Sequence, residues 1–240
     1  MGEPYKVLGI YSKNIIDHTG AGTTMQKAEH KTYYYVLRSC SEKYCVEPLN
    51  AKSLPSGIFT AMDRDQFISS FTPEIGYYRK NSIPEYESLA KMLASGDAQS
   101  IDAADSEIES LIRSLLIEPD NTSPETDTPL AKARLSEIVA ILDSSDKEFI
   151  EEQRREFNSA AISLRKLQLY EEAINFYSKA LELDENDENL HFNIARAYFE
   201  TGDEASTLAH IEKALEIDPV LESAILFKKY ILKKGAKKTD

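Results

Sequence analysis

The apolar and polar residues of the first third of the chain follow a pattern that is typical of short strands. Four segments rich in aromatic and β-branched residues are separated by Gly, Pro, Asn and Ser, which favour turns. These segments are YKVLGIYS, KTYYYVLRSC, KYCVEPL and SGIFTAM. We expect residues 1–82 to form a small β-rich domain with an antiparallel sheet and one or two short helices.

Two details of this domain follow from local sequence. The segment DHTGAGTT, from Asp17 to Thr24, is rich in turn residues and is predicted to be a loop or a wide hairpin turn. The segment from Asp63 to Phe71 is predicted to be a short helix, because Asp63 is a good N-cap and Pro73 would prevent the helix from continuing.

From about Pro84 the apolar residues recur at intervals of three and four, which is the period of an amphipathic helix. We expect residues 83–153 to form a helical region, interrupted by a polar, Pro-containing loop at 121–129 (NTSPETDTP). The segment SLLIEPDN at 114–121 is similar to KALELDEN at 179–186, which suggests degenerate repeats in this region. The alternative is an unrelated helical linker.

The segment YEEAINFYSKALELDEN, from Tyr170 to Asn186, is partly repeated later in the chain. Ala180, Leu181 and Asp184 recur 34 residues later as Ala214, Leu215 and Asp218. The alanines in this pattern let helix backbones approach closely, and the larger apolar residues between them fill the remaining space. A pair of helices exposes an apolar face and needs a neighbour, so the pattern predicts a stack of helix pairs.

Residues 154–219 resemble the tetratricopeptide repeat family, whose 34-residue unit is a pair of antiparallel helices. With units that start at Arg154 and Glu188, the family's pattern positions fall on Phe157, Ala160, Ala161, Leu164, Tyr170, Ala173, Tyr177 and Ala180, and on His191, Ile194, Ala195, Tyr198, Gly202, Thr207, Ile211, Ala214 and Pro219.

The sequence departs from the family's pattern at a few positions. Phe157 and His191 stand where the family usually has Trp, Glu185 stands where the first unit would have its closing Pro, and Thr207 replaces an Ala. The resemblance implies two repeats and a capping helix over residues 154–236. Together with the sheet, this gives an α+β fold: a small antiparallel β-rich domain followed by an α-helical solenoid.

The resemblance also implies a binding surface. In this family the first helix of each pair lines a concave groove that binds an extended peptide or a single helix of a partner protein. The family's groove positions are Arg155, Asn158, Ile162, Arg165, Lys166, Asn189, Phe192, Arg196, Phe199 and Glu200. The two Asn suit hydrogen bonds to a peptide backbone, the two Phe suit apolar side chains, and the four cations favour an acidic partner segment.

Some of these residues have a purely structural alternative. Phe192 and Phe199 can instead pack beneath neighbouring helices, and Arg155, Arg165 and Lys166 can form a solvated helix face. Some members of the family clamp a terminal carboxylate with Lys and Asn. The corresponding first positions here are Asn158 and Ile162, so we do not predict binding of chaperone tails.

Composition narrows the class of protein. The chain has 240 residues and a net charge of −13, which argues against binding to the phosphates of a nucleic acid. Its sequence has no apolar run near the roughly 20 residues of a membrane span and no signal-peptide pattern, so we expect a cytoplasmic protein. Cys40 and Cys45 could form a disulfide across a short hairpin, although two free thiols are expected in the cytoplasm.

The candidate chemistry is sparse. The spacing of the two cysteines is unusual for zinc, the sequence has no phosphate-binding or nucleophile motif, and we predict no metal, no cofactor and no enzymatic activity. His191 and His210 are expected to have packing or surface roles. Tyr33 and Tyr35 share one face of a strand, so Tyr34 lies on the other, where it can form an exposed platform or pack against a helix.

These observations predict a non-enzymatic protein–protein interaction module that binds a partner peptide or helix in the groove of a repeat array, as a scaffold protein would. Two alternatives remain open at this stage. One is a secretion or assembly chaperone. The other is a regulator with a small-ligand site near Tyr33, Tyr35 and His30 in the β-rich domain.

Overall fold

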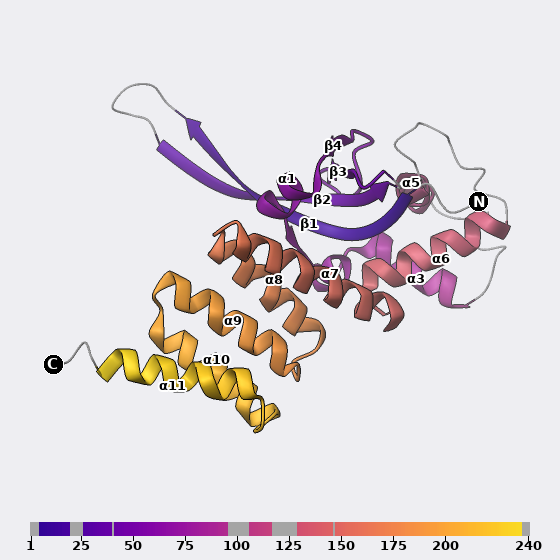
Figure 1. The fold of residues 1–240 in the computed structure, drawn as a ribbon. Helices are drawn as coiled ribbons and strands as arrows, with labels where there is room; N and C mark the ends of the chain where they lie inside the picture. Colours follow the sequence, from indigo (N-terminus) through magenta and orange to yellow (C-terminus); the bar gives the residue numbers. More distant parts are fainter. Residues whose placement is uncertain are drawn as a thin grey trace. The chain divides into compact units, whose positions relative to one another are not determined.

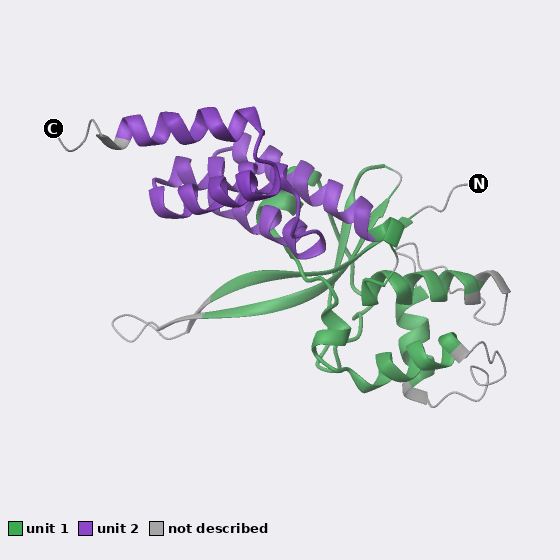
Figure 2. Ribbon diagram, turned by 90° about the horizontal axis from the view of Figure 1, so that it is seen from below, with its two compact units in different colours: residues 1–149 green, residues 150–240 purple. Residues whose placement is uncertain are grey.

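The computed structural model describes residues 5–19, 26–39, 41–95, 106–116, 129–145 and 147–236. Its elements, in chain order, are β1 (Tyr5–Thr19), β2 (Gln26–Ser39), β3 (Tyr44–Pro48), β4 (Thr60–Met62), α1 (Arg64–Ser70), β5 (Thr72–Pro73), α2 (Tyr77–Lys80), α3 (Pro84–Ser95), α5 (Ser106–Leu116), α6 (Pro129–Asp143), α7 (Lys147–Lys166), α8 (Tyr170–Leu183), α9 (Glu188–Thr201), α10 (Glu204–Ile217) and α11 (Glu222–Ala236) (Figure 1). The chain forms two compact units, residues 1–149 and 150–240 (Figure 2).

The first unit contains a five-stranded antiparallel sheet with the order β4-β3-β2-β1-β5, which confirms the predicted antiparallel sheet. The first two strands are longer than predicted. Asp17, His18 and Thr19 belong to β1 and pair with Ala28, Lys27 and Gln26 of β2, so the predicted loop is wrong for these three residues. Backbone hydrogen bonds across the hairpin hold them in a strand despite their polar composition. The rest of that predicted loop lies outside the described residues.

The outer half of the β1–β2 hairpin extends from the sheet as a two-stranded ribbon (Figure 1). The register pairs Lys13 with Thr32, and β3 joins β2 only from Tyr34 onward. Both faces of such a ribbon are open to solvent, which explains why polar residues such as Asn14 and His30 are exposed there together with the apolar Ile16, which is 46% exposed.

Helices cover both faces of the sheet. On one face, Phe67 of α1 stacks on Tyr44 with 4.4 Å between ring centroids and lies 4.9 Å from Tyr11. This helix begins after Asp63, as predicted, but the Asp63 side chain does not cap it and pairs with Lys43 instead. On the other face, residues of α2, α3, α5 and α6 share one apolar core with β1, β2 and β3.

The second face explains where the helices at 84–143 belong. A sheet face rich in apolar residues needs a covering layer, and α3, α5 and α6 provide it. These helices therefore fall in the same unit as the sheet, whereas the sequence suggested a separate region at 83–153. Residues 121–128 of the predicted polar loop lie outside the described residues, and Pro129 is the first residue of α6.

Three buried tyrosines hold this layer in place through their hydroxyl groups. Tyr35 donates to the carbonyl oxygen of Leu115 at 3.3 Å, Tyr78 to Ser53 at 2.9 Å and Tyr86 to Val139 at 2.6 Å. Each bond ties an aromatic side chain in the core to the backbone of another segment, so that the buried hydroxyl is satisfied.

The Tyr33–Tyr35 segment is used for packing on both faces of β2. Tyr33 packs on Tyr77 with 4.6 Å between ring centroids, and Tyr35 is fully buried. Tyr34, on the opposite face, packs edge-on against Phe71 at 5.0 Å and is half-buried. Of the two predicted alternatives for Tyr34, the structure therefore favours packing over an exposed platform.

Glu47 of β3 is a buried carboxyl group in this unit. Its residue is 1% exposed and lies opposite Tyr35 in the register of β2 and β3. One carboxyl oxygen accepts a hydrogen bond from the amide of Gly57, and the other has no hydrogen-bond partner among the described residues. Burial raises the pKa of Glu47 to about 7, and the Gly57 amide opposes this shift.

Replacing Glu47 with Gln should change how stability depends on pH. The unfolded chain ionises this group near 4.5, whereas the folded chain keeps it protonated up to about 7. The stability contributed by the protonated group is therefore complete below 4.5 and is lost as the pH rises to about 7. In urea unfolding followed by tyrosine fluorescence, the Glu47→Gln variant should lose less stability than the wild type over this interval and be more stable by about 3 kcal/mol above it.

A matched control is Glu87→Gln, which changes an exposed carboxyl group on α3. This variant should keep the wild-type dependence on pH. Identical pH profiles for Glu47→Gln and the wild type would contradict the assignment of Glu47 as the buried titrating group.

The second unit consists of successive helices that cross at small residues. Ala161, Ala173, Ala180, Ala195 and Ala214 have no exposed surface. Thr207, which replaces an Ala of the repeat pattern, is also fully buried, and its hydroxyl donates to the carbonyl oxygen of Asp203 at 2.6 Å. The satisfied hydroxyl explains why Thr is tolerated at this crossing.

The ends of these helices are well defined. Gly202 has a φ of 85° and ends α9, because Gly adopts the left-handed conformation without strain. The Asp187 side chain accepts hydrogen bonds from the amides of Asn189 and Leu190, and Asp203 accepts one from Ser206. These two carboxylates cap the starts of α9 and α10.

Two histidines meet between α9 and α10. The Nδ1 atoms of His191 and His210 lie 3.1 Å apart, and the His210 ring stacks on Tyr198 with 5.6 Å between centroids. Burial, and secondly the nearby His191, lower the pKa of His210 below its ordinary value of 6.5. The packing role that we predicted for these residues agrees with this arrangement.

Acidification should therefore weaken the second unit through His210. As the pH falls below about 6.5, the unfolded chain binds a proton before the folded chain does, so the free energy of unfolding decreases. In thermal unfolding followed by circular dichroism, His210→Gln should show a smaller loss of melting temperature below this pH than the wild type. The exposed His30 supplies the control variant His30→Gln, and an equal effect of both substitutions would contradict the prediction.

Candidate functional site

The predicted groove residues lie on α7 and α9, the first helices of the two repeat units that the sequence predicts. Four of them are exposed: Arg155, Lys166, Asn189 and Glu200. The other six are half-buried: Asn158, Ile162, Arg165, Phe192, Arg196 and Phe199. The set therefore combines partly packed side chains with exposed polar ones.

Specific polar contacts fix α9 beside α7. The Arg154 guanidinium pairs with the carboxylates of Asp187 and Asp184, the latter at 3.5 Å. Because Asp187 also caps α9, this contact ties the start of α9 to α7. Further along, the Asn193 amide nitrogen donates to the Asn158 carbonyl oxygen at 3.5 Å. The Asn158 side chain is thus held by a neighbouring helix.

Two of the predicted cations, Arg165 and Arg196, are half-buried. The Nε atom of Arg165 is buried and has no hydrogen-bond partner among the described residues. Burial raises the pKa of Tyr177, and the positive charges of Arg165 and Arg196 oppose this rise. Arg155 and Lys166 are exposed and remain the more accessible cations of α7.

The two groove phenylalanines both contact α11. The ring centroid of Phe227 lies 6.0 Å from that of Phe192 and 5.3 Å from that of Phe199. Part of the surface of each phenylalanine is therefore packed against α11, as the structural alternative predicted. Neither side chain is fully buried, so both still contribute apolar surface beside α11.

The structure places α11 beside the predicted groove residues of α9. A shift of 34 residues relates Phe192, Arg196, Phe199 and Glu200 of α9 to Leu226, Tyr230, Lys233 and Lys234 of α11. Leu226 is 57% exposed and Tyr230 is 55% exposed, and both lysines are exposed. The sequence pattern predicts this helix only as a cap, although the 34-residue spacing of the repeats also identifies these four residues.

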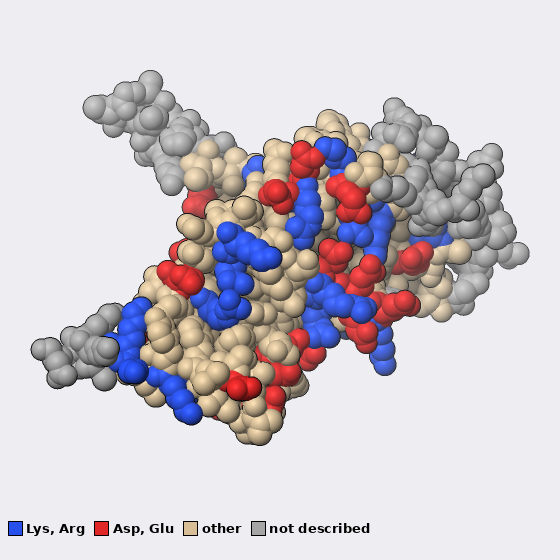
Figure 3. Space-filling model, viewed as in Figure 1, with Lys and Arg blue, Asp and Glu red and all other residues tan. Residues whose placement is uncertain are grey.

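Charge is distributed unevenly over the helices of this unit. On α8 and α10, Lys179 pairs with Glu182 at 2.7 Å and Lys213 pairs with Glu216 at 2.6 Å. On α11, basic side chains gather toward the C-terminal end of the helix (Figure 3). Cations on the second helices of the repeats are thus neutralised locally, while those at the end of α11 are concentrated.

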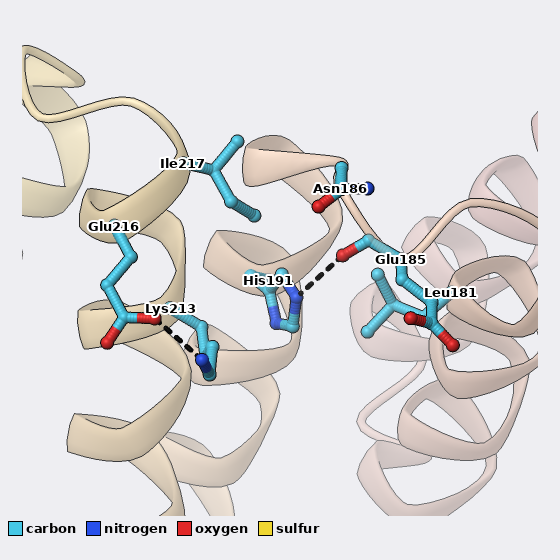
Figure 4. Close-up of a pocket in the computed structure, with 7 residues that line it drawn as sticks. All are labelled: Leu181, Glu185, Asn186, His191, Lys213, Glu216 and Ile217. Carbon is cyan, nitrogen blue, oxygen red and sulfur yellow. Dashed lines mark hydrogen bonds and ion pairs between the residues drawn. The ribbon is translucent and has the colours of Figure 1, made fainter.

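A separate pocket opens near the start of α9 and the end of α10 (Figure 4). It has a volume of about 720 Å³ and is lined by Leu181, Glu185, Asn186, His191, Lys213, Glu216 and Ile217. Its polar groups interact with one another: Lys213 pairs with Glu216, and His191 Nε2 lies 3.4 Å from the carbonyl oxygen of Glu185. The predicted groove residues do not line this pocket, so it is distinct from the groove.

The described part of the chain has few features of other kinds of site. Its residues contain no group of three or more His, Cys, Asp and Glu side chains that could hold a metal ion. None of its helices is both long enough and apolar enough to cross a membrane. Cys45 is buried on β3, while Cys40 lies outside the described residues. That both cysteines are free thiols therefore remains a prediction.

Comparison with protein families confirms the resemblance drawn from the sequence. The TPR repeat model matches residues 163–202, and the tetratricopeptide repeat model matches residues 189–220. Comparison with curated proteins gives no match. The two family matches cover the end of α7 and all of α8, α9 and α10, whereas the β-rich first unit has no family assignment. The part of the chain that matches tetratricopeptide repeats is therefore residues 163–220.

Proposed function

We propose that the chain is a non-enzymatic interaction module that binds a peptide or helix of a partner protein along α7 and α9. Tetratricopeptide repeats are typical of protein–protein interaction modules, and the family matches support this general role. The observation that carries the specific proposal is the side-chain set on α7 and α9. It offers amides, cations and apolar side chains with partial exposure on two adjacent helices.

The arrangement of these helices suits tight recognition. Buried alanines at the crossings, the Asp187 cap and the Arg154 pairs hold α7 and α9 in one geometry. A surface that is already ordered loses little conformational freedom when it binds. Less of the binding free energy is therefore spent on ordering the groove.

Each class of side chain has a separate role in the proposal. The amides of Asn158 and Asn189 hydrogen-bond the backbone of the bound segment, which fixes its position independently of its sequence. Ile162 and Phe192 contact apolar side chains. Arg155 and Lys166 attract carboxylates and increase the rate of association.

The ligand-binding alternative for the first unit is not supported by its geometry. Tyr35 is fully buried and donates to Leu115, and Tyr33 is packed on Tyr77. His30 is three residues before Tyr33 on β2, and side chains alternate along a strand, so His30 lies on the opposite face from Tyr33 and Tyr35. These three residues therefore do not surround one site, and the interaction role of the repeats remains the best-supported function.

Replacing Asn158, Asn189 and Arg196 with Ala should weaken partner binding by roughly a hundredfold. Three lost polar contacts of about 1 kcal/mol each correspond to this factor. The test is affinity capture with the full-length chain, followed by titration of the captured partner with wild-type and triple-variant protein. Helical content should change little, because Asn189 is exposed and Asn158 and Arg196 are only half-buried, so none of the three belongs to the fully buried core.

The matched control carries Asn175→Ala, Asn186→Ala and Lys229→Ala, which remove the same kinds of side chain from exposed positions outside the groove. This control should bind as the wild type does. Equal binding by the wild type and the groove variant would place recognition elsewhere on the chain.

A further inference from the structure

The helix α11 exposes more apolar surface than a terminal helix needs for packing. Its buried side is formed by Ala224 and Ile231, which join the core of α9 and α10. Leu226 and Tyr230, four residues apart, lie on one face of the helix, and each is more than half exposed. A solvent-exposed face with this composition suggests contact with another molecule.

This exposed face is continuous with the groove residues of α9. Tyr230 lies 5.9 Å from Phe199 and 6.5 Å from Phe227, measured between ring centroids. Phe227 in turn contacts Phe192 at 6.0 Å. The four rings form one aromatic surface that spans α9 and α11, which we call the aromatic strip: Phe192, Phe199, Phe227 and Tyr230.

Cations border the aromatic strip on both helices. The Lys234 Nζ atom lies 4.4 Å from the ring centroid of Phe199, and the Arg196 guanidinium lies 5.8 Å from that of Phe192. Such contacts place positive charge directly at the rim of the apolar surface. A ligand that covers the rings would therefore bring its neighbouring side chains next to these cations.

The cations on this side of the repeats also lack acidic partners. Among the described residues, Arg155, Lys166, Lys233 and Lys234 form no ion pair with a carboxylate. By contrast, Lys179 and Lys213 on the second helices are paired, and Lys228 of α11 pairs with Glu212 at 3.0 Å. In a chain of net charge −13, unpaired cations on one side are available to an acidic ligand.

We propose that α11 serves as a third groove helix and that the bound segment is acidic and amphipathic. Apolar side chains of the ligand cover the aromatic strip and Leu226, and carboxylates one turn away meet Lys233 and Lys234. This inference rests on the proposed function and adds the chemical class of the partner. The exposed acid Glu200 at the same groove disfavours a uniformly charged polyanion, such as a nucleic acid.

The test is selection from a display library of random peptides of about 12–15 residues, the length at which a helix becomes marginally stable. The full-length chain is the bait. Enriched peptides should combine Asp or Glu with Leu, Phe or other large apolar residues, and their affinity should fall as the salt concentration rises. Enrichment of neutral or basic peptides would overturn the proposal.

The matched pair of variants is Lys234→Glu and Lys229→Glu, which make the same charge change on one helix. Both lysines are exposed, but Lys229 is not one of the groove positions of α11. For an enriched peptide, Lys234→Glu should weaken binding by about tenfold and Lys229→Glu should have little effect. The milder Lys234→Gln variant, which retains helix propensity, should give a smaller loss in the same direction.

The outcomes separate this inference from the proposed function. If the Asn158, Asn189 and Arg196 variant loses the peptide but Lys234→Glu does not, the groove binds peptides without α11 and only the inference fails. If neither variant loses the peptide, or if no peptide is enriched, both the groove proposal and the inference are wrong. Equal losses of affinity for Lys234→Glu and Lys229→Glu would mean that binding depends only on the net charge of α11, which would also overturn the inference.

Discussion

The close contact of helices at buried alanines is the constraint on which the second unit depends. Ala161, Ala173, Ala180, Ala195 and Ala214 have no exposed surface, so larger side chains at these crossings would push the helices apart. Small residues recur after 34 positions at Ala161 and Ala195 and at Ala180 and Ala214. The helix spacing that they allow is the framework for the proposed groove.

The first unit solves a different packing problem. Its sheet is apolar on both faces, and helices from well-separated parts of the sequence cover them. Tyrosine hydroxyls satisfy backbone carbonyls of the covering layer, which gives the core specific as well as apolar contacts. Glu47 is the exception, since a buried carboxyl group with one unpaired oxygen makes this unit sensitive to pH.

Charge links the architecture of the repeats to their proposed role. Lysines on the second helices are neutralised by acids of the same helix, three residues away. At the groove the cations flank aromatic rings, as Lys234 does for Phe199. A protein that is acidic overall therefore presents an apolar and basic surface along one set of helices. Charge complementarity between this surface and the proposed acidic segment would favour specificity and rapid association over raw affinity.

The sequence by itself determined the repeat, its register and the Gly end of α9, because these depend on local periodicity and on the conformational freedom of Gly202. It also determined which residues α7 and α9 carry at the groove positions. Tertiary structure alone decided three things. It assigned α3, α5 and α6 to the sheet, it kept Asp17–Thr19 in β1 through cross-strand hydrogen bonds, and it placed Tyr230 and Lys234 of α11 beside Phe199. The reason is the same in each case, because these features depend on contacts between segments that are distant in the sequence, and local sequence patterns do not predict such contacts.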